Sequence, residues 1–307
     1  MVTSPVVFAR LDTEGKPMSQ NVKILHISDL HIEDLPARRY TEVEKSLAFV
    51  RARLIAARPD LVVVTGDLTT HGSAKVEDLV LAKDWLDELD LPYLVVGGNH
   101  DLGANQRRGK DYPEMEFYEE VPFHRTGFAK VFGTHMVETV DLGAVEVMTI
   151  NIRNGDPDGA IPILQRLVET GTKPLLLFGH YPLVTVRDRG ILADFGFGEF
   201  IPDSVDLLRQ VIIGSSRIRV YGCGHVHANT VRALSSECLQ MSAGALGPGS
   251  SSYRVLSIDQ NQLRYDTVLG DGPLGFWERL VCDFHEDVEY HLGAPWERSG
   301  TWNLFTS

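Results

Sequence analysis

The sequence predicts a single α/β domain, and three observations support this prediction. Apolar runs of strand length recur along the 307 residues, helical patterns separate the first of them, and no repeat, low-complexity tract or evident linker divides the chain. Hydrophobic residues make up 43% of the sequence, enough to bury a substantial core. This composition excludes a disordered protein.

Three apolar runs in the first hundred residues predict strands. They cover residues 23–29, 60–67 and 92–101. Their almost uniform apolar character is typical of strands that are buried on both faces, by helices or by a second sheet.

Two helices are expected between these strands. In the first, apolar residues recur at spacings of four, three and four, which places them on one helix face. They are Val43, Leu47, Val50 and Leu54. Pro59 ends this helix, and a second helix covers roughly residues 75–89. The first third of the chain therefore has the order β-α-β-α-β.

The second half of the sequence predicts further strands. Residues 137–152 indicate a hairpin that turns near Leu142 and Gly143, and residues 253–269 indicate a half-exposed antiparallel hairpin with its turn at 259–262. Residues 173–180 and 218–227 contain two more buried runs, each reaching a Gly-His pair.

The expected domain boundaries follow from these elements. Residues 1–22 form an N-terminal extension, residues 23–269 the domain, and residues 270–307 a C-terminal arm that contains Trp277, Trp296 and Trp302. The arm could pack on the domain, cover its site or make a homo-oligomer contact.

The charge of the chain limits its partners. A net charge of −13 opposes binding to nucleic-acid backbones and to anionic membrane surfaces. A small phosphate ester bound over divalent cations remains compatible, because the cations would be the largest local charges in the site. The charge therefore makes a nucleic-acid polymer an unfavourable partner, argues against a membrane and leaves a small phosphate-ester substrate open.

Cysteine usage and the N-terminus favour a cytoplasmic protein. The three cysteines are widely spaced without a C-x-x-C motif, which indicates core thiols in a reducing compartment. They are Cys223, Cys238 and Cys282. The first twenty residues have no signal-peptide pattern, and no run of about 18 apolar residues occurs in the chain.

Residues with metal-ligand chemistry follow five of the apolar runs. The five clusters are Asp29-x-His31, Gly66-Asp67, Gly98-Asn99-His100-Asp101, Gly179-His180 and Gly224-His225-Val226-His227. Because strand carboxyl ends face the ligand crevice in open α/β sheets, these side chains can converge. Glycine before a ligand allows close approach of the backbone to an ion. Carboxylate, amide and imidazole donors without thiolate suit Mn, Fe, Zn, Ni or Co.

Asp67 lies in the middle of this set and could bridge two ions with its two oxygens. Two ions roughly 3.5–4 Å apart can hold a hydroxide between them and clamp the attacking and leaving oxygens of an in-line displacement. The pattern therefore fits a two-metal site for an in-line displacement by a bridging hydroxide.

The order of these motifs over about residues 23–230 resembles that of the calcineurin-like metallophosphoesterase superfamily. The motifs are D-x-H, G-D, G-N-H-D, G-H and G-H-x-H. The group most similar in motifs is that of class III cyclic-nucleotide phosphodiesterases and glycerophosphodiesterases. The resemblance implies a four-layer α/β/β/α sandwich, with two mixed sheets flanked by helices. It further implies one metal held by Asp29, His31, Asp67 and His227, and a second held by Asp67, Asn99, His180 and His225.

The resemblance also implies roles in catalysis. His100 would contact the substrate phosphate or protonate the leaving oxygen, and Asp101 would orient His100 through a hydrogen bond. Asn99 would also face the substrate. Two subfamilies are disfavoured: Thr70 stands where purple acid phosphatases have a ligand tyrosine, and Asp101 where Ser/Thr protein phosphatases have glutamate.

Other residues have both a functional and an ordinary interpretation. Basic residues after the first and third clusters could bind phosphate oxygens, although charged loop residues are usually solvated. They are Arg38, Arg39, Arg107, Arg108 and Lys110. Tyr181 and Pro182 could shape the pocket or support His180, and residues 187–200 could form a flap or a packed loop. His71 could touch substrate, His26 is expected in the core, and His124 and His135 have no assigned role.

The expected function is hydrolysis of a small phosphodiester or phosphomonoester, with a cyclic nucleotide or a glycerophosphodiester as the leading substrate. Two alternatives stay open. The DNA-repair nuclease branch shares G-N-H-D and G-H-x-H, although the acidity of this chain argues against DNA. Some superfamily members are non-catalytic scaffolds, in which the ligand set typically erodes.

Overall fold

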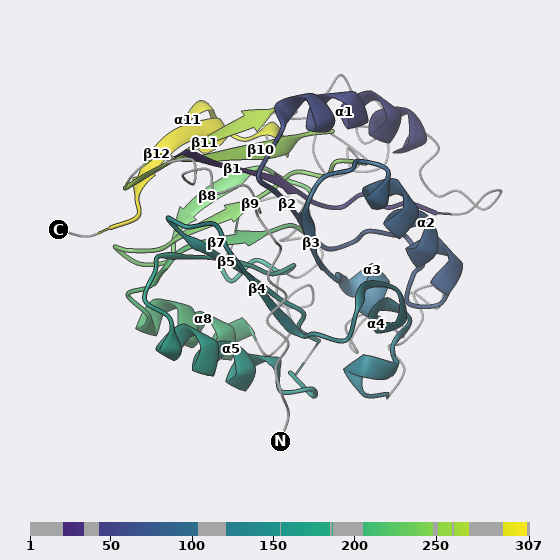
Figure 1. The fold of residues 1–307 in the computed structure, drawn as a ribbon, viewed down its shortest axis with the longest axis horizontal. Helices are drawn as coiled ribbons and strands as arrows, with labels where there is room; N and C mark the ends of the chain where they lie inside the picture. The colour runs from purple at the N-terminus through teal and green to yellow at the C-terminus, as the bar shows by residue number, and fades with distance from the viewer. Residues whose placement is uncertain are drawn as a thin grey trace, which may run out of the picture.

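Two six-stranded mixed sheets pack face to face between helices (Figure 1). The computed structural model describes residues 21–33, 43–103, 121–153, 155–184, 186, 205–247, 251–259, 261–269 and 291–305. Helices α1 and α2 cover the outer face of the first sheet, and helices α5 and α8 cover that of the second. The four-layer α/β/β/α sandwich implied by the resemblance is confirmed.

The first sheet has the strand order β12-β11-β10-β1-β2-β3. These strands are β1 (Asn21–Ile27), β2 (Leu61–Thr65), β3 (Tyr93–Val96), β10 (Tyr253–Asp259), β11 (Gln262–Val268) and β12 (Ser299–Asn303). The predicted order β-α-β-α-β is confirmed, with α1 (Val43–Ala57) and α2 (Val76–Asp87) between the strands, and β1, β2 and β3 run parallel. The predicted β10–β11 hairpin also forms, with Asp259 paired to Gln262.

The second sheet has the order β4-β5-β6-β7-β9-β8. Its strands are β4 (Val137–Asp141), β5 (Glu146–Ile150), β6 (Leu175–Phe178), β7 (Ile218–Cys223), β8 (Thr230–Ala233) and β9 (Leu239–Ser242). The predicted β4–β5 hairpin is present, and β5, β6, β7 and β9 run parallel. Helices α5 (Ala160–Thr170) and α8 (Val205–Gly214) lie on its outer face.

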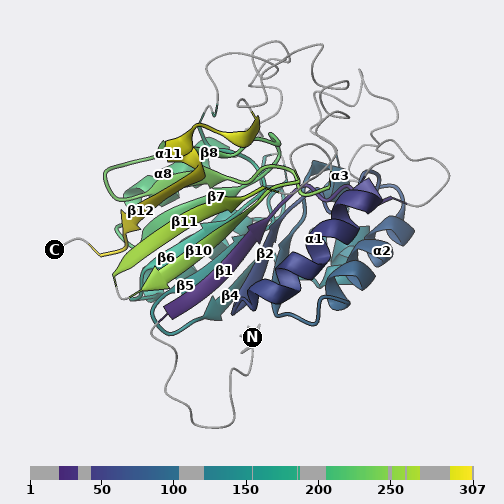
Figure 2. The same ribbon diagram turned by 90° about the horizontal axis from the view of Figure 1, so that it is seen from above.

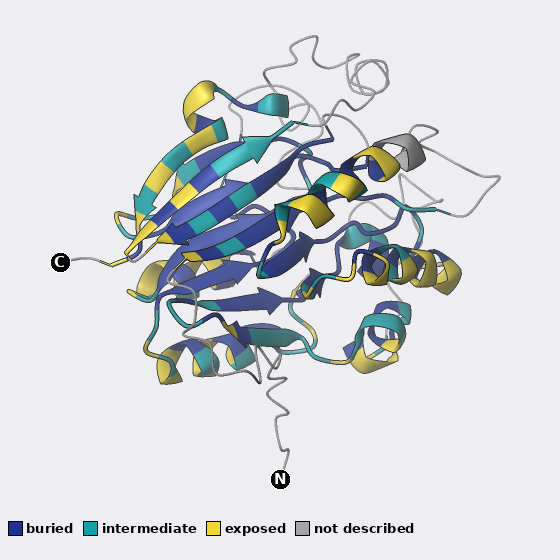
Figure 3. Ribbon diagram, turned by 45° about the horizontal axis from the view of Figure 1, so that its top comes forward, coloured by how far each residue is buried: buried dark blue, intermediate teal, exposed yellow. Residues whose placement is uncertain are grey.

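Side-chain alternation explains why the central strands are apolar on both faces. In β2, Val62 and Val64 pack in the cluster that includes α1 and α2, whereas Leu61 and Val63 pack between the two sheets. Figure 3 shows buried strands at the centre and exposed residues on the outer faces of the helices. Burial on both faces therefore requires a run without polar positions.

Several elements differ from the sequence-based description. β1 begins at Asn21, two residues before the expected boundary. Within residues 270–307, β12 pairs antiparallel with β11 and so belongs to the first sheet. Four short elements that the sequence did not predict are also present among the described residues. They are α3 (Asn99–Leu102), η1 (Phe123–Arg125), α4 (Gly127–Phe132) and α11 (Pro295–Arg298).

Two further observations concern the described residues. Cys223 and Cys238 are buried free thiols, as expected of core cysteines. In the described part of the chain, we find no helix with the length and apolar character needed to cross a membrane.

Candidate metal centre

The clusters predicted from the sequence lie at the carboxyl ends of five strands. Asp29 and His31 follow β1, Asp67 follows β2, and Asn99 follows β3. The second sheet contributes His180 after β6, and His225 with His227 after β7. Figure 2 shows these strands from above, with the two sheets stacked. Both sheets therefore supply residues to one site.

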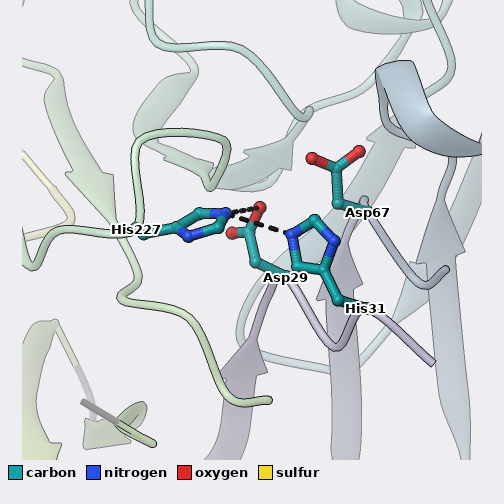
Figure 4. A group of neighbouring side chains, drawn as sticks. All are labelled: Asp29, His31, Asp67 and His227. Carbon is teal, nitrogen blue, oxygen red and sulfur yellow. Dashed lines mark hydrogen bonds and ion pairs between the residues drawn. The ribbon is translucent and has the colours of Figure 1, made fainter. Parts of the chain in front are cut away.

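A first group consists of Asp29, His31, Asp67 and His227, whose candidate ligand atoms all lie within 4.8 Å of one another (Figure 4). The two Nε2 atoms of His31 and His227 are 3.1 Å apart. His227 Nε2 also lies 3.3 Å from Asp29 Oδ1. The side chains point toward a common centre.

A second group consists of Asp67, His180 and His225, again with candidate ligand atoms within 4.8 Å. His180 Nε2 lies 3.1 Å from His225 Nδ1 and 3.4 Å from Asp67 Oδ2. Asn99 Oδ1 approaches the same nitrogen to 3.1 Å. Asp67 belongs to both groups, so the two groups share one carboxylate.

The backbone at these residues adopts a conformation that L-amino acids rarely use. The φ angles are positive at Asp29 (54°), His31 (51°), Asp67 (47°), His225 (71°) and His227 (52°). Non-glycine residues in this left-handed region are uncommon and cluster at functional sites, where the surrounding structure holds them. Five of the seven predicted ligands therefore occupy strained turns immediately after their strands.

Two glycines allow these turns to meet. Gly66 has φ +90°, and a Cβ there would collide with the imidazole of His180 and lie 2.9 Å from the Gly98 Cα. A Cβ at Gly98 would collide with the carboxylate of Asp67. Close contacts with neighbouring loops thus require glycine before both Asp67 and Asn99, and the positive φ also favours glycine at Gly66.

Hydrogen bonds from the backbone hold the candidate ligands in place. His180 Nδ1 lies 2.7 Å from the Thr65 carbonyl, which directs Nε2 toward the site. The Asp29 carboxylate accepts from the His225 amide at 3.1 and 3.2 Å. Asp67 Oδ1 accepts from the His100 amide at 3.0 Å. Each of these contacts joins two different strand ends.

The arrangement fits metal ions. Donors separated by 3.1 Å have the spacing of neighbours in a coordination shell, where metal–nitrogen distances of roughly 2.0–2.1 Å place adjacent ligands roughly 3 Å apart. Burial lowers the pKa of His180, but the Asp67 and Asp29 carboxylates outweigh it and raise that pKa to about 9. The site therefore favours positive charge, and binding of a cation would displace this proton.

The pKa of Asp67 also reflects this environment. Burial opposes ionisation of the Asp67 carboxyl, yet His180, His100 and His31 hold its pKa well below the usual range. An ionised, buried carboxylate at the shared position is suited to a cation on either side.

Asp101 corrects one expectation. Its Oδ2 accepts from the amides of Leu68 (3.0 Å) and Gly98 (2.9 Å), and its Oδ1 accepts from the Thr69 amide (3.0 Å) and hydroxyl (2.7 Å). Through these hydrogen bonds, the Asp101 carboxylate connects the loop after β2 to the loop after β3. The expected hydrogen bond between the His100 ring and the Asp101 carboxylate is wrong, because both carboxylate oxygens accept from these other donors and His100 Nδ1 faces the Thr70 carbonyl.

His100 is oriented by a backbone carbonyl in place of Asp101. Its Nδ1 lies 2.8 Å from the Thr70 oxygen, and its ring centroid lies 5.1 Å from that of His31. The sequence contained no signal for this partner, because every residue has a carbonyl and only the fold decides which one faces the ring.

The structure places the remaining candidates as follows. Tyr181 is buried, with its ring 4.9 Å from that of His180 and 5.0 Å from that of His225. His71 Nε2 lies 3.7 Å from Glu33. His26 is fully buried between the sheets, as expected, and desolvation together with Arg254 lowers its pKa to about 3. Arg38, Arg39, Arg107, Arg108, Lys110, Cys282 and residues 187–200 lie outside the described residues.

A sandwich of two mixed sheets with Asp, Asn and His gathered at the strand ends defines a class of metal-dependent hydrolases. The chain belongs to the calcineurin-like phosphoesterase family, which matches residues 22–229. The family is metal-dependent, and the chain is a phosphoric ester hydrolase.

Three curated relatives with different names are similar to parts of this chain. A probable glycerophosphodiester phosphodiesterase (GpdQ) of Arcobacter nitrofigilis is 25% identical over 66% of this chain and 71% of its own. A probable cyclic nucleotide phosphodiesterase of Synechococcus is 28% identical, with coverages of 70% and 76%. One component of the nuclease SbcCD of Staphylococcus epidermidis is 24% identical, with coverages of 88% and 75%.

The fold is also similar to a solved structure. A dimetal phosphatase from Danio rerio superposes with a TM-score of 0.58, covering 81% of this chain and 96% of that protein, at 12% sequence identity. This likeness supports the fold.

Proposed function

We propose that this chain hydrolyses a small phosphodiester, with a cyclic nucleotide or a glycerophosphodiester as the leading substrate class and a phosphomonoester next. The observation that carries the proposal is the shared carboxylate of Asp67, which belongs to both groups of candidate ligands. Two divalent ions bound there would supply a hydroxide nucleophile near neutral pH and neutralise charge on the phosphate oxygens.

Each residue has a role in this proposal. Asp29, His31, Asp67 and His227 would hold one ion, and Asp67, Asn99, His180 and His225 the other. His100, held at Nδ1 by the Thr70 carbonyl, would donate a proton to the leaving oxygen. Mn, Fe, Zn, Ni and Co all suit these nitrogen and oxygen donors.

Two observations support a small substrate. Relatives bear the names of a probable glycerophosphodiester phosphodiesterase and a probable cyclic nucleotide phosphodiesterase. The net charge of −13 repels long phosphate backbones. A cytoplasmic location, with small phosphate esters as partners, belongs to the same proposal.

The decisive experiment replaces Asp67 with an isosteric neutral residue. Asp67→Asn should lose most bound metal and at least 100-fold of the turnover of bis(p-nitrophenyl) phosphate, because both ions lose a charged ligand. Metal content is measured by plasma mass spectrometry, and turnover is measured after loading with Mn, Zn, Ni or Fe. Asp78→Asn, which changes an equally buried carboxylate on α2, is the matched control and should retain both.

Two outcomes would contradict the proposal. One is undiminished turnover by wild-type protein stripped of metal. The other is full metal content and turnover in Asp67→Asn. A panel of cyclic nucleotides, glycerophosphodiesters and sugar phosphates then selects the substrate class.

A metal-dependent DNA nuclease is the second candidate, because the relative from the SbcCD nuclease aligns over 88% of this chain. A nuclease should cut single- or double-stranded DNA and bind it with a steep salt dependence. Hydrolysis of small diesters without DNA cleavage at low salt would exclude this candidate.

A further inference from the structure

Residues 291–298, here named the C-terminal brace, lie against the loop that carries His225 and His227. The Asn229 amide donates to the His291 carbonyl at 2.8 Å, and the Asn229 side chain donates to the same oxygen at 3.3 Å. His291 Nδ1 lies 3.4 Å from the carbonyl of His227 itself. Helix α11 of the brace also contacts β8, which follows this loop. The brace therefore touches the ligand loop directly.

Gly293 makes this contact close. Its φ is +83°, and a Cβ there would lie 2.5 Å from the Asn229 carbonyl oxygen and 3.3 Å from the Glu297 side chain. Both the backbone conformation and the contact exclude a larger residue. The brace is thus fitted to the ligand loop at van der Waals distance.

Buried charged groups anchor the other end of the brace. The Glu297 side chain is 4% exposed and accepts from Arg232 at 2.9 Å. Arg254, which is fully buried, donates to the carbonyl of Glu297 and to that of Thr230, each at 2.9 Å. A buried arginine that lost these carbonyl partners would keep unsatisfied N–H donors, so the contacts fix the position of the brace.

The brace also reaches the loop that follows His180. Arg232, held by Glu297, donates through its second guanidinium nitrogen to the carbonyl of Val186 at 2.9 Å. Its guanidinium lies 5.6 Å from the ring centroid of Trp296. Arg232 of β8 thereby connects the brace to the loop that follows His180.

The ligand loop needs support at both ends. His225 and His227 have left-handed backbones (φ 71° and 52°), and such strain persists only where neighbouring contacts enforce it. The Asp29 carboxylate holds the His225 amide at the first end of the loop. At the second end, two residues beyond His227, Asn229 is held by His291 of the brace.

We propose that the C-terminal brace positions His227 and thereby sets the affinity of the ion that Asp29, His31, Asp67 and His227 would hold. The inference rests on the proposed function, because it concerns one of the two proposed ions. Gly293, Glu297 and Asn229 are positioning residues, which act through His227 and not on the substrate.

The test compares two alanine variants with equal backbone strain. Gly293→Ala should push the brace away from Asn229, whereas Gly159→Ala, at φ +74° with nothing within 4 Å of its Cβ, should leave the loop intact. Both are titrated with Co²⁺ while its visible absorption is recorded. His227→Ala identifies which titration step belongs to the ion in question.

Gly293→Ala should bind Co²⁺ about 10- to 100-fold more weakly at that step, with the other step unchanged, because contacts behind a ligand typically affect affinity by this factor. Glu297→Gln should weaken Co²⁺ binding at the same step by a smaller factor. If Gly293→Ala does not fold, the Co²⁺ affinity of Glu297→Gln tests the inference by itself. Equal Co²⁺ affinity in the tested variant and wild type would overturn the inference. Loss confined to thermal stability, equal in Gly293→Ala and Gly159→Ala, would do the same.

The wild-type titration separates the two proposals. Two Co²⁺ steps in the wild type, with no difference in the brace variants, would overturn the brace and leave the proposed function standing. Fewer than two steps in the wild type would overturn both.

Discussion

His100 has the geometry of a proton donor that is fixed by the backbone. The Thr70 carbonyl lies 2.8 Å from Nδ1, and the His100 amide donates to Asp67 Oδ1 at 3.0 Å. Its side chain can therefore be removed without deleting a candidate metal ligand. This separates proton transfer from metal binding in a single variant.

We predict that His100→Ala retains its metal but loses turnover, and that the loss is larger for substrates whose leaving oxygen is more basic. Proton donation contributes about 10²–10⁴-fold for alkoxide leaving groups and little for p-nitrophenolate, which leaves without help. Turnover of a series of aryl and alkyl phosphodiesters measures this, with His124→Ala on the exposed η1 turn as control. Equal losses across the series would exclude the proton-donor role.

At the scale of elements, Asp101 connects two strand-end loops. Its carboxylate accepts from the loop after β2 through Leu68 and Thr69, and from the loop after β3 through Gly98. The two loops carry Asp67 and Asn99, so the contacts of Asp101 fix how far apart these two candidate ligands lie. Asp101 thus acts on the site through the backbone.

Asp101→Asn should lower the free energy of unfolding by on the order of 2–4 kcal/mol, because an amide NH₂ would face buried N–H donors. It should also weaken metal binding about 10-fold. Urea melts and metal titrations measure the two effects. Asp156→Asn, which replaces one of the two carboxylate oxygens that accept backbone amides at the start of α5, should lower stability without affecting metal affinity. If Asp101→Asn kept full metal affinity but changed how turnover depends on the leaving group, Asp101 would have the expected role of orienting His100.

At the scale of the whole molecule, the site joins the two sheets. Asp29, His31, Asp67 and Asn99 follow strands of the first sheet, whereas His180, His225 and His227 follow strands of the second. Ions bound between them would crosslink the sandwich at one edge. Because the unfolded chain has no such site, metal binding is linked to folding.

We predict that metal raises the melting temperature of the protein. At a free Mn²⁺ concentration 100 times its dissociation constant, binding stabilises the fold by about 2.7 kcal/mol, which raises the melting temperature by roughly 4 °C for a chain of this size. Calorimetry with Mn²⁺ and with a chelator measures the shift, and Asp67→Asn should not show it. Identical melting temperatures in both buffers would contradict a structural contribution of the ions.

The sequence by itself determined the order β1-α1-β2-α2-β3 and both hairpins, since apolar periodicity and turn residues are local signals. The set Asp29, His31, Asp67, Asn99, His180, His225 and His227 could also be proposed from sequence, since each residue directly follows an apolar strand. Helices α5 and α8 were not predicted individually, although Ile161, Leu164 and Val168 have helical spacing.

Only the tertiary structure decided how these residues are held. The role of Asp101, the Thr70 carbonyl behind His100 and the contact of Gly293 with Asn229 involve backbone groups from distant segments. Every residue carries such groups, so composition and spacing do not identify the partners. Chain packing brings them within hydrogen-bonding distance, and hydrogen bonds depend on distance and direction.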